Sequence, residues 1–72
     1  MKRAIELTGV NGKVAIAVES VVAVIEVRQN PDPTKDDGVR SAVFIDGQAN
    51  NFAATENYEY VMNYLTSARN ES

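Results

Sequence analysis

The sequence predicts one α+β domain over residues 1–72, in which five antiparallel strands form a small β-meander or partly open barrel and one C-terminal helix follows. Three observations support this prediction. Apolar residues alternate with other residues through the first half of the chain, as they do in half-buried strands. Asn-Gly and Asp-Gly dipeptides separate such runs, as they do in hairpins. The last segment changes to helical spacing.

The first two strands, near residues 3–9 and 13–18, are predicted by alternation on either side of Asn11-Gly12. Both central residues of such a two-residue turn need positive φ, which these two residues tolerate. The turn places Leu7 opposite Ile16 and Ile5 opposite Val18. All the large apolar residues of the hairpin then share one face, as a half-buried antiparallel pair requires.

The third strand, near residues 21–29, is apolar on both faces. Val21, Ala23 and Ile25 are expected on one face, and Val22 and Val24 on the other. Such a strand is either central in a sheet or has a second face that meets another subunit. Val22 and Val24 are therefore candidate interface residues. The proline- and aspartate-rich stretch 30–38 is predicted to be a loop.

A fourth strand is expected at 39–45, a turn at Asp46-Gly47 and a fifth, poorer strand at 48–53. Thr55 is predicted to cap a helix over 56–68, with Glu56 in its first turn. Residues at helical spacing should form its buried stripe. They are Tyr58, Val61, Met62, Leu65 and Ala68. The tail 69–72 is expected to fray.

The composition excludes several classes of protein. Cysteine and histidine are both absent, which removes disulfides, the commonest metal ligands and Ser-His or Cys-His catalysis. We therefore expect no enzyme, no metal and no cofactor. The net charge of −3 argues against nucleic-acid binding. No run is long and apolar enough for a membrane span, and no signal peptide is recognised, so a cytoplasmic location is expected.

The order of motifs resembles the small FlbD-type proteins encoded with bacterial flagellar genes. The resemblance rests on an Asn11-Gly12-Lys13 hairpin, a valine-rich strand, a Val43-x-Ile45-Asp46-Gly47 turn and a final helix anchored by Tyr58, Val61 and Leu65. It covers most of the chain, although loop 30–38 is longer here than in the family pattern. It implies the same fold but carries over no catalytic residues.

Four polar residues are candidates for ligand binding. Asn50 and Asn51 stand in a predicted strand, where amides are disfavoured, so they either bind a polar ligand or lie on an exposed edge or bulge. Arg28 and Arg40 flank the long loop and either clamp an anion or pair with the nearby aspartates. The aspartate pairing is the stronger interpretation.

Acidic and aromatic clusters complete the candidates. Asp32, Asp36 and Asp37 have the oxygens that calcium prefers, but their spacing differs from the EF-hand pattern and favours a solvated loop. Tyr60 and Tyr64 lie four residues apart on the predicted helix. They either form an exposed interface or cover the sheet.

The sequence thus predicts a non-catalytic, oligomeric binding module with a structural or regulatory role. A chain of 72 residues without cysteine has a thin core, so association with itself is the expected means of stabilisation. A second, unidentified protein is a further expected partner. The alternative is a protein that sequesters a small, nucleotide-like anion in pockets at subunit interfaces, as proposed for some phage-encoded anti-defence proteins. A nucleic-acid-binding small barrel is disfavoured by the acidic charge.

Overall fold

The computed structural model describes residues 3–70 and confirms the predicted α+β class, with five antiparallel strands and one C-terminal helix. The elements follow in the order β1 (Ala4–Gly9), β2 (Gly12–Ala17), the 3₁₀ turn η1 (Val18–Ser20), β3 (Val21–Glu26), β4 (Ser41–Ile45), β5 (Phe52–Ala54) and α1 (Tyr58–Asn70). Helix α1 continues to Asn70, whereas fraying was expected from residue 69. Residues 71–72 of that predicted tail lie outside the described residues.

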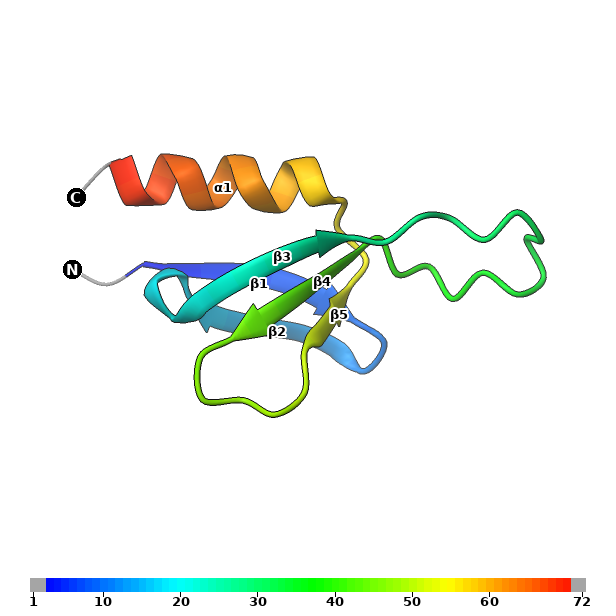
Figure 1. Ribbon diagram of the computed structural model, residues 1–72, viewed down its shortest axis with the longest axis horizontal. Helices are drawn as coiled ribbons and strands as arrows, with labels where there is room; N and C mark the ends of the chain where they lie inside the picture. Colours follow the sequence, from blue (N-terminus) through cyan, green and yellow to red (C-terminus); the bar gives the residue numbers. More distant parts are fainter. Residues whose placement is uncertain (1–2, 71–72) are drawn as a thin grey trace.

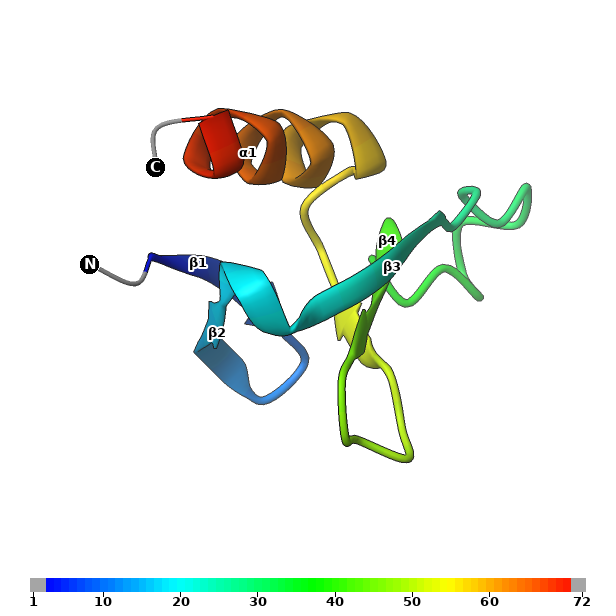
Figure 2. The same cartoon turned by 60° about the vertical axis from the view of Figure 1, so that its left-hand side comes forward.

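The strands divide into two sheets and, over residues 3–70, do not close into a barrel. One sheet has the order β1-β2 and the other β3-β4-β5. Helix α1 lies on one side of both sheets (Figures 1 and 2). The long connection between β3 and β4 extends away from the rest of the fold (Figure 1). This connection begins after Glu26 and ends before Ser41, so it is longer than the predicted loop 30–38.

The first hairpin has the predicted buried face but a register shifted by two residues. Leu7 pairs with Val14 and Ile5 pairs with Ile16, so the predicted Leu7–Ile16 and Ile5–Val18 pairings are both wrong. The chain reverses at residues 10–11, and Gly12 is the hairpin residue with positive φ. Because a shift of two residues leaves every side chain on its original face, Ile5, Leu7 and Ile16 are still all buried.

A β-bulge changes the predicted faces of β3. Val21 pairs with Ile45, and the register then shifts so that Ala23 pairs with Phe44. Val22 is the extra residue of the bulge. The alternation of side chains between the two faces of the strand therefore shifts by one residue after Val22. Val24 consequently packs on the core side together with Val21, whereas Val21 was predicted to share a face with Ala23 and Ile25.

The second hairpin and the start of the helix also differ from prediction. The turn at Asp46-Gly47 forms, with a hydrogen bond from the Gln48 N–H to the Ile45 carbonyl. The returning strand β5 begins at Phe52, so the strand predicted over 48–53 is mostly loop. Asn57, not Thr55, caps α1, because its Oδ1 accepts the Tyr60 N–H at 2.7 Å.

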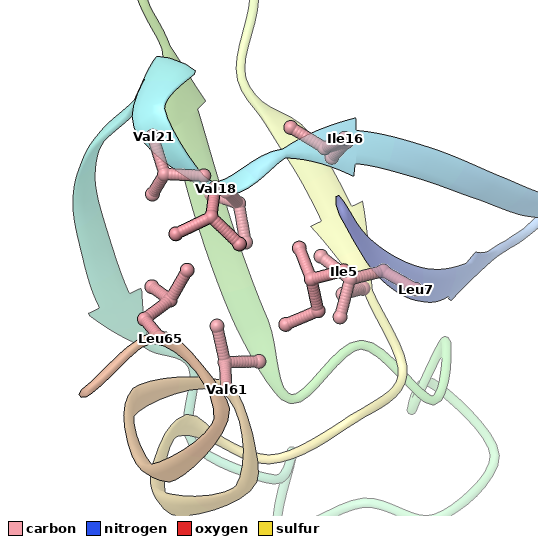
Figure 3. Close-up of a cluster of buried hydrophobic side chains, with 9 residues drawn as sticks. Ile5, Leu7, Ile16, Val18, Val21, Val61 and Leu65 are labelled. Atoms are coloured by element: carbon pink, nitrogen blue, oxygen red, sulfur yellow. The ribbon is translucent and has the colours of Figure 1, made fainter. Parts of the chain in front are cut away.

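The core lies between the two sheets and α1. Ile5 and Leu7 from β1 belong to one buried cluster with Val61 and Leu65 from α1 (Figure 3). Ile16 of β2 and Val18 of η1 also belong to this cluster; its remaining members, from the three-stranded sheet, are Val21, Val43 and Ala54. The predicted stripe of α1 is confirmed in Val61 and Leu65, which are buried, and in Met62 and Ala68, which pack against the cluster. Tyr58, the first predicted member of the stripe, is half-buried and does not belong to the cluster.

The segment after β5 joins the two sheets through hydrogen bonds. The Thr55 N–H donates to the Thr8 carbonyl at 2.8 Å, and the Thr8 N–H donates to both Glu56 carboxylate oxygens at 2.8 and 3.1 Å. The buried Ser41 hydroxyl donates to the Glu56 carbonyl at 2.8 Å. Glu56 therefore contacts β1 through its side chain and β4 through its backbone.

Replacement of Glu56 by alanine is expected to destabilise the fold. It leaves the Thr8 N–H without its acceptor, and hydrogen bonds to charged groups contribute about 1.5–3 kcal/mol. Urea unfolding should show a loss in this range. The matched control, Glu59→Ala on the exposed side of α1, should change the free energy of unfolding by no more than about 0.5 kcal/mol. Equal losses in the two variants would contradict the role assigned to Glu56.

Candidate functional site

The loop before β4 is organised by its own aspartates. The Asp32 carboxylate accepts hydrogen bonds from the Thr34 backbone N–H and hydroxyl. Asp36 Oδ1 accepts the Gly38 N–H at 2.9 Å, and Asp37 Oδ1 accepts the Val39 N–H at 3.0 Å. These bonds explain why short acidic residues recur in the loop. Within residues 3–70, no group of three or more acidic side chains is placed to hold a metal ion.

Arg40 is held against Asp36 by a two-point contact. Its Nη1 donates to Asp36 Oδ1 at 3.0 Å and its Nη2 donates to Oδ2 at 2.8 Å. Nη1 also donates to the Val39 carbonyl. The predicted pairing of an arginine with the loop aspartates is thus confirmed for Arg40. The hydrogen bonds from Arg40 and the Gly38 N–H lower the pKa of Asp36 below its usual range.

Arg28 and Arg40 line one pocket, of about 350 Å³, where the long loop meets the start of α1. The Asn57 and Tyr58 residues at the helix start and Glu26 at the end of β3 also line it. Arg28 is exposed, and Glu26 places a negative charge in the same pocket. With Arg40 paired to Asp36, the two arginines do not form a concentrated positive clamp.

Asn50 and Asn51 lie elsewhere, in the exposed loop between β4 and β5. Asn51 lines a second pocket, of about 300 Å³, together with the first hairpin turn. In this region the Phe52 ring lies over Gly9, where any side chain would collide with it. The structure therefore does not bring the four predicted ligand-binding residues into one site. Asn50 and Asn51 lie in a loop and not in a strand, so their amide side chains do not conflict with strand propensity.

The tyrosine pair is divided between two environments. Tyr64 packs against the core, and its hydroxyl donates to the Ala4 carbonyl at 2.6 Å, which ties α1 to β1. Tyr60 is 51% exposed. Of the predicted aromatic interface, Tyr60 is therefore the more accessible member.

Strand β3 carries the largest exposed apolar residues of the three-stranded sheet. Val22 is 64% exposed and Ile25 is 52% exposed. Of the two predicted interface residues on β3, Val22 is exposed, whereas Val24 is half-buried and packs against the core. Because β3 is an edge of its sheet, its backbone is also accessible on one side.

The sequence reasoning missed Ser41, Glu56 and Asn57. Asn57 is a residue type preferred at helix N-caps, and its side chain accepts the N–H of Tyr60, three residues later. The sequence therefore contained a signal for this cap. Ser41 and Glu56 are joined only by the tertiary fold, and nothing in the sequence indicates their contact. No helix within residues 3–70 has both the length and the apolar character needed to span a bilayer.

Comparisons with protein-family models, with curated proteins and with solved structures found no match for this chain. The resemblance to FlbD-type proteins accordingly remains a hypothesis that rests on the hairpin and turn motifs.

The Asp36 titration gives a direct test of the loop geometry. Carbon-detected NMR should place the Asp36 pKa below the ordinary aspartate range, and Arg40→Ala should raise it. Because the folded-state pKa is lowered, the contact stabilises the fold above the ordinary carboxyl pKa. That stability is lost as pH falls through the lowered value. The control Arg28→Ala should leave the Asp36 titration unchanged; an equal shift in both variants would contradict the assigned contact.

Proposed function

We propose that this protein is a non-catalytic interaction module that acts as a homo-oligomer. The supporting observation is the apolar outer face of the β3-β4-β5 sheet, which is turned away from the core. Ala23 pairs with Phe44, and Ile25 pairs with Ala42, which in turn pairs with Ala53. These cross-strand neighbours lie on the face opposite Val24 and Val43, which pack in the core.

The composition of this outer face fits a protein contact better than a solvated surface. Antiparallel sheets with one face in water normally carry polar residues on it. Here the five paired positions are all apolar, and Ile25 at 52% and the neighbouring Val22 at 64% are large and exposed. Covering such side chains releases about 25 cal/mol for each Å² of apolar surface removed from water.

The size of the chain favours association for a second reason. A 72-residue protein without cysteine has a thin core and no disulfide to reinforce it. Apolar surface buried between subunits offsets part of the conformational entropy that the chain loses on folding, which the small core of one subunit offsets only in part. Self-association through the sheet would therefore both stabilise the fold and form the proposed oligomer.

The alternative of a ligand-sequestering protein has less support. Arg40 is bound to Asp36, and Asn51 lines a different pocket from Arg28. A subunit interface would have to assemble such a site from separate surfaces. Nucleophilic catalysis by a Ser-His or Cys-His pair is not possible, since histidine and cysteine are absent from the sequence.

Light scattering coupled to size exclusion tests the proposed oligomer. The native protein should have a mass of at least twice the 7.8 kDa of one chain at micromolar concentration. Ile25→Lys should weaken association at least about tenfold, because it places a charge in a desolvated contact. The matched control is Val10→Lys, at a site that is 75% exposed on the hairpin turn. A 7.8 kDa monomer for the native protein would overturn the proposal.

A further inference from the structure

We infer that the second copy joins through β3: the two β3 strands pair antiparallel about a two-fold axis at Val24. The three strands of each sheet would then form one continuous sheet of six. This inference rests on the proposed self-association and adds its geometry. It follows from the backbone directions, the two ends of the open edge and the charges placed there.

The backbone of β3 presents donors and acceptors on its open side. The Val27 N–H donates to the Arg40 carbonyl, so Val27 directs its backbone groups toward β4. Since direction alternates along a strand, Ile25 also points toward β4. Val24 and Glu26 therefore direct their N–H and C=O groups away from β4, toward the open edge. An unpaired row of this kind is a template for another strand.

The open stretch has two defined ends. At one end, the Arg69 guanidinium donates from Nη2 to the Val21 carbonyl at 3.1 Å and so occupies the edge there. At the other end, β3 stops at Glu26. Residues 22–26 remain available between these limits. A segment that pairs with its own copy in antiparallel fashion does so about its midpoint, which is Val24.

This register brings opposite charges together. With the axis at Val24, Glu26 of one copy lies opposite Val22 of the other. Val22 and Arg69 line the same groove between β3 and α1, so Glu26 approaches the second copy's Arg69. The contact occurs twice in the dimer because of the symmetry. Displacing the axis to Glu26 would instead place two carboxylates opposite each other, which is destabilising.

The same register fits the outer face. Ile25 lies opposite Ala23 of the second copy, so a large side chain meets a small one on each side of the axis. The pairing brings the second copy beside the strand that carries Val22 and Ile25, the exposed large apolar residues of this sheet. The β2 edge of the other sheet, by comparison, carries Lys13 and the less exposed Val14, at 37%. It therefore has less apolar surface for a second copy to cover.

Disulfide trapping can test the register cleanly, because the native chain has no cysteine. In the proposed dimer Val24 faces itself, with Cα atoms about 5.5 Å apart, within disulfide range. Val24→Cys should form a covalent dimer rapidly under mild oxidation. A mixture of Val22→Cys and Glu26→Cys proteins should form the mixed dimer faster than either protein forms its own.

Two single-cysteine controls set the background rate. Val14→Cys lies on the β2 edge and Val10→Cys on the hairpin turn, and both should crosslink at least about tenfold more slowly than Val24→Cys. Circular dichroism should show that each variant folds. If Val24→Cys fails to fold, the mixed Val22→Cys and Glu26→Cys experiment decides the register, because both of those side chains are exposed.

The outcomes separate this inference from the proposed function. A native oligomer in which neither Val24→Cys nor the mixed pair crosslinks above background would overturn the β3 pairing but leave self-association intact. Preferential crosslinking of Ile25→Cys to itself would overturn the axis at Val24. A native protein that is monomeric by mass would overturn both.

A charge substitution provides an independent test. Glu26→Lys should weaken the dimer roughly tenfold at low salt, because it replaces two attractions to Arg69 by two repulsions. Glu6→Lys makes the same change of charge at an exposed position on β1, in the other sheet, and should change the dissociation constant less than about twofold. Equal weakening by the two variants, measured by sedimentation equilibrium, would contradict the Glu26–Arg69 contact.

Discussion

The hydrogen bonds made by residues 55–56 are the constraint on which the rest of this fold depends. The two sheets share no continuous ladder, so their relative position needs another connection. Thr55 and Glu56 provide it by bonding Thr8 of β1, while the Glu56 carbonyl accepts the buried Ser41 hydroxyl of β4. Thr55 and Glu56 directly precede Asn57, the cap of α1. Residues 55–57 therefore position the two sheets and the start of the helix relative to one another.

This arrangement determines which surfaces of the three-stranded sheet remain open. With α1 and the first hairpin covering the inner face, the outer face and the β3 edge are left to solvent. The bulge at Val22 then decides which side chains appear there, because it moves Val24 inward and leaves Ile25 outside. One extra residue in one strand therefore links the packing of the core to the apolar surface that we propose as the contact.

The sequence predicted what depends on local pattern and missed what depends on tertiary contacts. Alternation correctly identified the buried Ile5, Leu7 and Ile16, since their faces survive a register shift of two. The bulge has no local signature in a run of valines and alanines, so the faces of β3 were misassigned. Pairing of Arg40 with an aspartate was predictable because the partners lie four residues apart. The contact between Ser41 and Glu56 was not, because only the assembled fold brings them together.

Hydrogen exchange at the Val24 amide is the most direct test of the central claim that β3 pairs with a second copy. In a lone subunit this N–H points away from β4, whereas the Ile25 N–H points toward β4 and provides an internal reference. Our account predicts that protection of the Val24 amide increases with protein concentration in parallel with dimer formation, while the Ile25 amide is protected throughout. Rapid, concentration-independent exchange of the Val24 amide in a sample shown to be dimeric would contradict it.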